Sequence, residues 1–291
     1  MDNGLTPTPD PTAAAAVQGW IFSVRRSGRT WLRWLMASAI ARESGDSGEV
    51  DWLSVFQIIP NDHPTQTWKQ YDLVPGFLDR DNPPRLVMTH CRFEDFYATD
   101  APVLVLARRP FDQMASNYHH VQAGLFKPPK PGRTRKNWAP DEFALAPGQG
   151  LDFYLTAYRG WAAEVACGRA FAVGYEELKS DTTRTLLRIF DVLGVAMSRA
   201  SARAAVEYCT FSRMAEAERA KHAILPNWDF DPNVRRTREG QVGRGAALFS
   251  PKTIRTVNRR LSAEPDSLHQ LLRSASNWTL TDSMALEGPE S

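Results

Sequence analysis

Arginine and hydroxyl side chains crowd around a glycine in residues 25–30, which read Arg-Arg-Ser-Gly-Arg-Thr. This segment lies between a short apolar run and a stretch of good helix formers. Free backbone N–H groups and the dipole at a helix start attract phosphate, and arginine adds charge-assisted hydrogen bonds. The pattern predicts an anion-binding loop. It lacks the first glycine and the Gly-Lys-Ser/Thr ending of a Walker A loop. A turn with solvated arginines is the alternative.

A second arginine, Arg108, follows the apolar run 103–107, and Ser116 comes eight residues later. Ser116 lies about two helical turns beyond Arg108, so both side chains can reach one phosphate if the intervening chain bends. The alternative is that Arg108 pairs with a nearby carboxylate such as Asp112.

One histidine stands where a general base is expected. His90 follows the strand candidate 85–89, and an imidazole titrates near neutrality, so it can accept a proton there. A structural histidine at a strand end is the competing interpretation.

The elements that must position these residues alternate along the chain. Short apolar runs predict strands at 20–24, 85–89, 103–107 and, more weakly, 170–174. Helical stretches are expected at 30–41, 110–121, 151–167, 181–193, 201–209 and 252–263. This order predicts an α/β fold with an open, mainly parallel sheet flanked by helices. Ligands of such sheets bind beyond the carboxyl ends of the strands.

Composition bounds the class of protein. The 291 residues carry 35 Lys and Arg against 33 Asp and Glu, a net charge of +2, which argues against a general nucleic-acid binder. The sequence contains no run of about 18 apolar residues, so no membrane-spanning helix is predicted. The three cysteines and the scattered histidines indicate neither a disulfide framework nor a metal site. We expect a cytoplasmic protein with tails at 1–18 and 282–291 and a single domain at 19–281.

Several separated segments resemble the cytosolic-type sulfotransferases that use 3′-phosphoadenosine 5′-phosphosulfate (PAPS). In that family Lys or Arg precedes Ser-Gly-Thr-Thr-Trp, a strand-end Arg is followed by Pro and Ser, and Lys-Thr-His carries the base. Further matches are Tyr-Glu-Asp-Leu, Thr-Ser-Phe-x-x-Met and Arg-Lys-Gly-x-x-Gly. Their counterparts here are residues 26–31, 108–116, 89–90, 175–178, 209–214 and 238–243.

The resemblance implies a P-loop-like sulfotransferase fold and a set of roles. The implied catalytic residues are His90, Arg26 and Ser116. The implied nucleotide-binding residues are Arg26, Ser27, Gly28, Arg29, Thr30, Trp31, Arg108, Ser116, Tyr175, Thr210, Phe211, Arg238, Glu239 and Gly240. Trp31 and Phe211 would offer aromatic faces to one purine, although each alone is equally read as a core residue.

Three positions depart from the family pattern. Arg26 replaces the usual Lys and keeps its proton, so it acts only by charge and hydrogen bonding. Met88 stands where a second Lys is common, and Glu239 replaces another. Arg29, Arg92 or Arg244 are candidate compensating cations.

The implied reaction transfers a sulfuryl group from PAPS to a hydroxyl or amine of a small-molecule acceptor by in-line displacement, with no metal, no nucleic acid and no membrane involved. The apolar segment 52–60 is a candidate acceptor wall, and the basic loop 127–136 is a candidate recruiter of acidic acceptors. The alternatives are a P-loop-related small-molecule kinase and a non-catalytic adenine-nucleotide binding module. The oligomeric state and the acceptor stay open.

Overall fold

The computed structural model describes residues 17–62, 84–96, 100–123, 137–224 and 242–276, and their strands form one parallel sheet. The strand order is β2-β3-β1-β4-β5, and every neighbouring pair is parallel. The strands are β1 (Gly19–Ser23), β2 (Asn61–Asp62), β3 (Leu86–Thr89), β4 (Val103–Ala107) and β5 (Ala170–Gly174). The carboxyl ends of β3, β1 and β4 therefore meet at one edge of the sheet, beside the loops that carry the predicted site.

Helices cover both faces of the sheet, as the short apolar strands predict. The described helices are α2 (Arg29–Glu43), α3 (Ser54–Ile58), α4 (Pro110–Gln122), α5 (Pro140–Leu145), α6 (Gly150–Ala166), α7 (Tyr175–Ser180), α8 (Thr182–Val192), α9 (Arg199–Tyr208), α10 (Phe211–Ile224), α11 (Pro251–Ser262) and α12 (Asp266–Ser276). Two short 3₁₀ turns, η2 (Phe93–Asp95) and η3 (Gly245–Leu248), complete the described elements.

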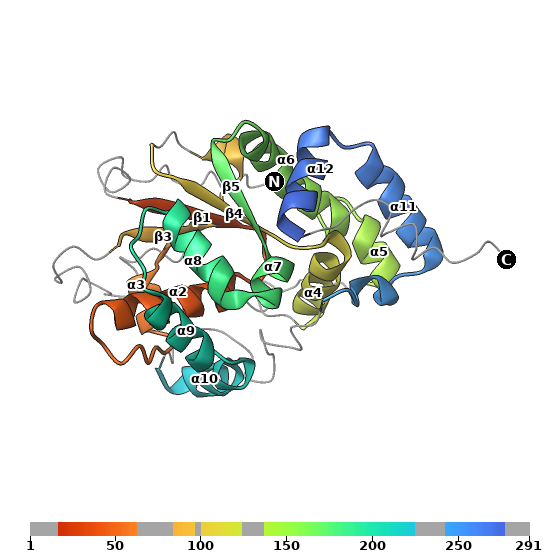
Figure 1. The fold of residues 1–291 in the computed structure, drawn as a ribbon. Helices are drawn as coiled ribbons and strands as arrows, with labels where there is room; N and C mark the ends of the chain where they lie inside the picture. The colour runs from red at the N-terminus through yellow and green to blue at the C-terminus, as the bar shows by residue number, and fades with distance from the viewer. Residues whose placement is uncertain (1–16, 63–83, 97–99, 124–136, 225–241, 277–291) are drawn as a thin grey trace.

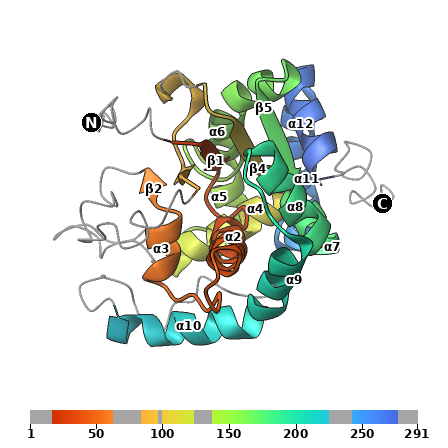
Figure 2. The ribbon, with the colours of Figure 1, turned by 60° about the vertical axis from the view of Figure 1, so that its left-hand side comes forward.

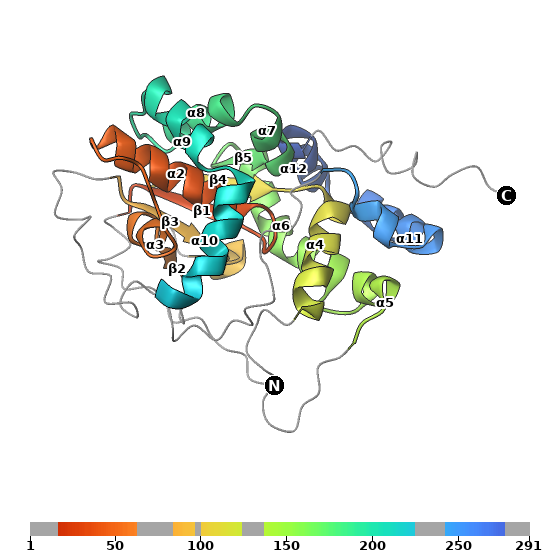
Figure 3. The same ribbon diagram turned by 90° about the horizontal axis from the view of Figure 1, so that it is seen from below.

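The side chains of β1 and β4 alternate between two apolar cores. In β1, Ile21 packs with α2, α3, α8 and α9, whereas Trp20 and Phe22 pack with α4, α6, α11 and α12. In β4, Leu104 joins the first core and Val105 the second. Figure 1 shows the corresponding grouping of α2, α8 and α9 away from α6, α11 and α12. Figure 2 shows α10 running below α2 and α3, and Figure 3 shows it in front when seen from below.

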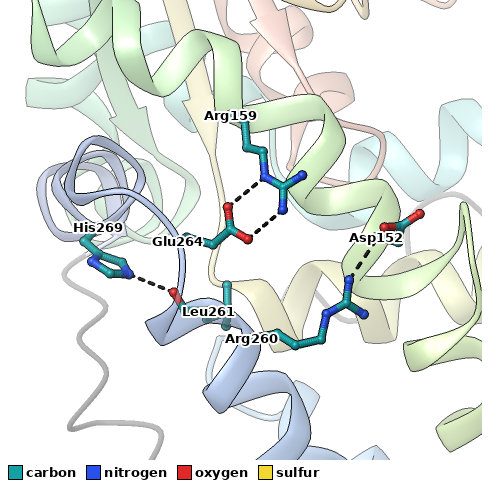
Figure 4. Close-up of polar contacts among 6 residues, drawn as sticks. All are labelled: Asp152, Arg159, Arg260, Leu261, Glu264 and His269. Carbon is teal, nitrogen blue, oxygen red and sulfur yellow. Dashed lines mark hydrogen bonds and ion pairs between the residues drawn. The ribbon is translucent and has the colours of Figure 1, made fainter.

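The C-terminal helices are tied to the outer side of α6 (Figure 4). Arg159 donates two hydrogen bonds to Glu264, each 2.7 Å long. Arg260 lies 3.6 Å from Asp152, and His269 bonds the carbonyl of Leu261 at the end of α11. The Arg159 side chain is 51% exposed, so the pair contributes at most about 1 kcal/mol to stability. It mainly orients α11 and α12 against α6.

The predicted elements agree with the structure within a few residues. The helix expected at 252–263 begins at Pro251, and the Ser250 hydroxyl accepts from the Thr253 N–H at its start. The short elements β2, α3, α5 and α7 and the whole of α10 and α12 were not predicted. None of the helices in the described ranges has the length and apolar character that a membrane crossing needs.

Candidate active site

The loop between β1 and α2 has the shape of an anion cradle. Arg26 has φ = 70° and Gly28 has φ = 93°, so left-handed residues flank the buried Ser27. These conformations turn the chain sharply into the start of α2, whose first N–H groups have no acceptor within the helix, while the Ser27 N–H donates to the Val24 carbonyl at 3.3 Å. The first turn of α2, which begins at Arg29, contains no acidic residue. The loop therefore presents N–H groups, a helix dipole and arginine charge to the same place.

Glycine is required at position 28 for two reasons: the positive φ of the backbone and the closeness of the Tyr175 ring. A Cβ atom at Gly28 would lie 2.3 Å from Cδ2 of Tyr175. The Tyr175 ring is buried, and the Arg108 guanidinium lies 4.5 Å from its centroid. Trp31 meets the same ring edge to face at 6.0 Å between centroids. The aromatic ring thus fills the space behind the loop and fixes the loop's distance from Arg108.

We expect Gly28→Ala to weaken binding of adenosine 3′,5′-bisphosphate (PAP) by at least tenfold. A side chain at positive φ costs about 1 to 3 kcal/mol, and the new methyl group overlaps the Tyr175 ring. Gly45→Ala is the matched control, because Gly45 has φ = 86° but has no atom within 4 Å of the added Cβ. Calorimetric titration should separate the two variants. Equal affinities would show that the contact with Tyr175 does not shape the loop.

The two predicted phosphate-binding segments meet in the structure. The Arg26 Nε donates to the Ser116 hydroxyl at 3.1 Å, and the Arg108 Nη1 donates to the Arg26 carbonyl at 2.9 Å. These two hydrogen bonds join residues that are 90 and 82 positions apart in the chain. The alternative for Arg108 named Asp112 as its partner, but the Asp112 carboxylate instead accepts from two backbone N–H groups of another segment.

Two tyrosines of α6 hold these segments together from behind. The Tyr158 hydroxyl donates to the Leu106 carbonyl at 2.9 Å and lies 3.0 Å from the Ser27 hydroxyl. The Tyr154 hydroxyl donates to the Arg108 carbonyl at 2.8 Å. Burial raises the pKa of both phenols, well above its usual value for Tyr154. Both therefore act as neutral hydroxyl groups.

Asp112 anchors the segment that follows the predicted 3′-phosphate loop. Its Oδ2 accepts from the Gly243 N–H and its Oδ1 from the Gly245 N–H, both at 2.7 Å. A Cβ at Gly245 would lie 2.3 Å from the Phe111 carbonyl oxygen, so only glycine allows this close approach. Arg238, Glu239 and Gly240 themselves lie outside the described residues, and their roles stay predictions.

We expect Asp112→Asn to lower PAP affinity by about tenfold while leaving AMP affinity nearly unchanged. An amide offers only one oxygen, so one of the two N–H groups loses its acceptor, which costs about 1 to 3 kcal/mol. Asp181→Asn is the control, because the Asp181 carboxylate also accepts a backbone N–H, that of Arg184, but at the start of α8. A uniform loss for PAP and AMP would contradict a role specific to the 3′-phosphate.

His90 lies at the carboxyl end of β3 with its ring fixed by β1. The ring Nδ1 bonds the Ser23 carbonyl oxygen. A carbonyl only accepts, so Nδ1 carries the proton and Nε2 holds the lone pair. Burial lowers the pKa of His90 well below 6.5, and the positive charges of Arg29, Arg25 and Arg33 lower it further. The imidazole is therefore neutral at pH 7 and able to accept a proton.

Arg29 contacts the backbone of Met88, the residue that stands where the family pattern has lysine. Its Nη2 donates to the Met88 carbonyl at 3.2 Å and also to the Asn61 side chain in β2. Arg33 from the next turn of α2 donates to the same Asn61 oxygen and stacks on Phe56 at 4.3 Å. Met88 itself is fully buried in the core. Of the three candidate compensating cations, Arg29 is the one with a hydrogen bond to Met88.

The predicted purine contacts cluster at the junction of α2, α9 and α10. The Trp31 indole N–H donates to the Cys209 carbonyl at 3.2 Å, and the Lys179 ammonium lies 5.2 Å from the Trp31 ring. Phe211 is 39% exposed and so keeps an available face. The Thr210 hydroxyl accepts from the Arg213 N–H at the start of α10. Thr210 is thus shown capping a helix, and its predicted nucleotide contact stays a prediction.

A cavity of about 250 Å³ opens beside His90. It lies between the end of β1, the loop after β3, and α6. It is lined by Phe22, Ser23, Val24, Arg25, His90, Arg92, Gly148, Phe153, Thr156 and Ala157. The expected wall at 52–60 is not part of this lining. Trp52 and Phe56 pack with Trp34 in the core instead, because α3 turns its aromatic side toward α2.

Several residues of this site were not singled out from the sequence. Tyr154, Tyr158 and Asn61 contact the predicted residues through tertiary packing. Glu176 belongs with them, since its Oε1 accepts from the Arg109 N–H beside Arg108. The only sequence signal was the placement of the tyrosines four residues apart on a predicted helix, which puts both on one face. In the described ranges, no three His, Cys, Asp or Glu side chains group as a metal site requires.

A family comparison bears on this geometry. The model of the sulfotransferase domain matches residues 18–266, a span that includes every site segment above. The chain belongs to the sulfotransferase domain family. This sulfotransferase has serine, glycine, threonine and tryptophan at residues 27, 28, 30 and 31, with arginines at 26 and 29, all within the matched span.

Curated relatives of this sulfotransferase are similar at low identity. Sulfotransferase 2A1 of Rattus norvegicus is 23% identical over 223 residues, which cover 75% of this chain and 74% of that protein. The 3-alpha-hydroxysteroid sulfotransferase of Cavia porcellus is 24% identical over 229 residues, covering 75% and 73% respectively.

Solved structures share the fold of this sulfotransferase. Mouse sulfotransferase SULT7A1, complexed with PAP, superposes with a TM-score of 0.57 at 19% identity, covering 90% of this chain and 91% of that chain. Retinol dehydratase in a complex with retinol and PAP gives a TM-score of 0.58 at 16% identity, covering 89% and 82%. The expected α/β sulfotransferase fold is confirmed.

Proposed function

We propose that this sulfotransferase transfers the sulfuryl group of PAPS to a hydroxyl or amine of a small-molecule acceptor, with His90 as the base. The observation that carries the proposal is the direct contact between the two phosphate-binding segments, Arg26 with Ser116 and Arg108 with the Arg26 carbonyl. Residues that we assign to two phosphate positions thereby lie side by side, which supports their binding one nucleotide with two separate phosphates. Structural neighbours hold PAP, and one of them also holds retinol.

The donor fits the residues that surround the loop. The backbone N–H groups of the β1–α2 loop and the start of α2 would bind the 5′-phosphosulfate. Arg108, with Ser116 and the loop at 238–240, would bind the 3′-phosphate, and Trp31 with Phe211 would stack on the base. Arg26 and Arg29 remain charged throughout, so they would stabilise negative charge growing on the leaving phosphate without donating a proton.

The acceptor is activated on the other side of His90. The lone pair on Nε2 takes the proton of the acceptor hydroxyl as the oxygen attacks sulfur. The bond between sulfur and the bridging phosphate oxygen breaks in line, and PAP leaves with both electrons of that bond. The products are a sulfate ester, PAP and a proton held by His90, which passes to solvent.

Two measurements test the proposal together. Calorimetry should show that PAP binds at least tenfold more tightly than AMP, because the 3′-phosphate adds charge-assisted hydrogen bonds. Incubation with PAPS and a panel of phenols and alcohols should release PAP in amounts equal to the sulfated product. Equal affinity for PAP and AMP, or magnesium-dependent turnover of ATP instead, would contradict the proposal and favour a nucleotide-binding module or a kinase.

A further inference from the structure

The Tyr158 hydroxyl on α6 contacts two segments of the candidate site at once. It donates to the carbonyl of Leu106 in β4 at 2.9 Å and lies 3.0 Å from the Ser27 hydroxyl in the loop after β1. Leu106 stands two residues before Arg108. One buried oxygen atom therefore links the loop assigned to the 5′-phosphosulfate with the strand end that leads to the residues assigned to the 3′-phosphate.

The protons of this linkage have one consistent arrangement. A carbonyl oxygen only accepts, so the single proton of the Tyr158 phenol goes to Leu106. The Ser27 hydroxyl must then donate to the Tyr158 oxygen. Burial raises the pKa of Tyr158, so the phenol keeps its proton. The hydroxyl proton of Ser27 is thus directed toward α6 and not toward a phosphate oxygen.

The backbone of Ser27 is engaged within the protein as well. Its N–H donates to the Val24 carbonyl at 3.3 Å. Both donors of Ser27, the N–H and the hydroxyl, are therefore used to hold the loop. Ser27 was expected from the sequence to bind the nucleotide, whereas these contacts favour a role in fixing the loop that other residues of the segment use for binding.

The Tyr158 ring is packed tightly enough to hold a fixed distance. Tyr158 and Ser27 are fully buried. The ring meets Phe22 of β1 edge to face at 5.9 Å and lies 4.7 Å from the Tyr154 ring, measured between centroids. Side chains in such close-packed surroundings have little room to shift. The separation between the loop and the end of β4 is therefore set by the position of α6.

Tyr154, one turn earlier on α6, makes only half of this linkage. It is also fully buried, and its hydroxyl donates to the Arg108 carbonyl at 2.8 Å. Among the described residues, its hydroxyl has no hydrogen bond to positions 24–28 of the loop. Both phenols thus bond the chain at the end of β4, but Tyr158 alone of the two also reaches Ser27.

We propose that Ser27 and Tyr158 are a positioning pair, which holds the two phosphate-binding segments at the separation that one doubly phosphorylated nucleotide needs. This rests on the proposed use of PAPS and assigns residues that act through the loop rather than on the ligand. A ligand that fills both positions gains most when their separation is set before binding, because ordering the segments on binding costs free energy. A ligand with one phosphate fills one position and does not depend on the separation.

Three adenosine ligands test the proposal by calorimetry. AMP carries only the 5′-phosphate, adenosine 3′-phosphate only the 3′-phosphate, and PAP carries both. We expect Tyr158→Phe to weaken PAP by about tenfold, since a net hydrogen bond contributes about 0.5 to 1.5 kcal/mol. The affinity for each monophosphate should stay nearly unchanged.

Tyr154→Phe is the matched control on the same face of α6. It also removes one buried phenol hydroxyl from a backbone carbonyl of the chain at β4, so a general loss of stability affects both variants alike. Because Tyr154 contacts only the 3′-phosphate side, this variant should weaken PAP and adenosine 3′-phosphate by one common factor and leave AMP unchanged. The same pattern in Tyr158→Phe would overturn the proposal.

A double-mutant cycle isolates the bond between the pair. Ser27→Ala removes one hydroxyl and should reproduce the selective loss of PAP affinity even if Tyr158→Phe folds poorly. The double variant should lose no more PAP affinity than either single variant, because each removes the same bond. Additive losses, or an equal loss for PAP and both monophosphates, overturn the proposal while PAPS turnover continues. A wild-type enzyme that binds PAP no more tightly than AMP contradicts the sulfotransferase reaction itself and this proposal with it.

Discussion

His90→Ala is expected to reduce kcat by about a thousandfold while PAP affinity stays within about threefold of wild type. Positioned proton transfer typically contributes factors of 10² to 10⁴, and His90 contributes no group to the predicted nucleotide contacts. The measurement is PAP release under saturating PAPS together with calorimetry of PAP. His269→Ala is the control, because that ring also bonds a backbone carbonyl, at the end of α11, away from the cavity.

The same residue sets the expected pH dependence. The neutral imidazole is the active form, and the pKa of His90 is lowered by burial and by Arg29, Arg25 and Arg33. The ring therefore stays neutral as the pH falls through 6.5, and activity is lost only below that value. We expect kcat/KM to be flat from pH 8 to pH 6.5 and to decline at lower pH. An acid limb centred at or above 6.5, or wild-type turnover in His90→Ala, would remove His90 from its proposed role.

Arg108→Gln is expected to abolish most of the preference for PAP over AMP. A hydrogen bond to a charged group contributes about 1.5 to 3 kcal/mol, and every 1.4 kcal/mol is a factor of ten in affinity. The ratio of the PAP and AMP dissociation constants should therefore shrink by about 10- to 100-fold. AMP binding should change little, since the cation is assigned to the 3′-phosphate.

The matched control for Arg108 is Arg188→Gln, a cation removed from α8. If both variants lower PAP affinity equally, the effect is one of total charge and not of position. If Arg108→Gln weakens PAP and AMP by the same factor, Arg108 acts through the Tyr175 ring on which it stacks and not through the 3′-phosphate. A thermal unfolding curve for each variant shows whether loss of the Arg26 carbonyl contact also lowers stability.

The sheet and its loops were predictable because their signals are local. The run 103–107 predicted β4 (Val103–Ala107) with the same boundaries, and the run 85–89 predicted β3 within one residue. The rule that ligands bind at the carboxyl ends of strands then placed Arg26, His90 and Arg108 on one edge. Segments far apart in the chain became neighbours in the structure, as expected.

What the sequence did not reveal depends on tertiary packing. Asn61 contacts Arg29 only because β2 pairs with β3. That pairing lets the Asn61 side-chain oxygen accept a hydrogen bond from the Arg29 guanidinium. Asp112 was considered as a partner of Arg108 because it lies nearby in the sequence. In the structure its carboxylate instead accepts from the N–H of Gly243, 131 residues away. Such contacts leave no periodic or compositional pattern in the chain.

The two hydroxyls that secure the phosphate loop have an electrostatic consequence. Tyr158 and Tyr154 stay protonated at every physiological pH, because burial raises the pKa of each phenol. A carboxylate in either place would bring a permanent negative charge beside the loop that we propose binds the phosphosulfate. By bracing this loop with neutral hydroxyl groups, the protein adds no further negative charge to the carboxyl groups of Asp112 and Glu176 that already lie nearby.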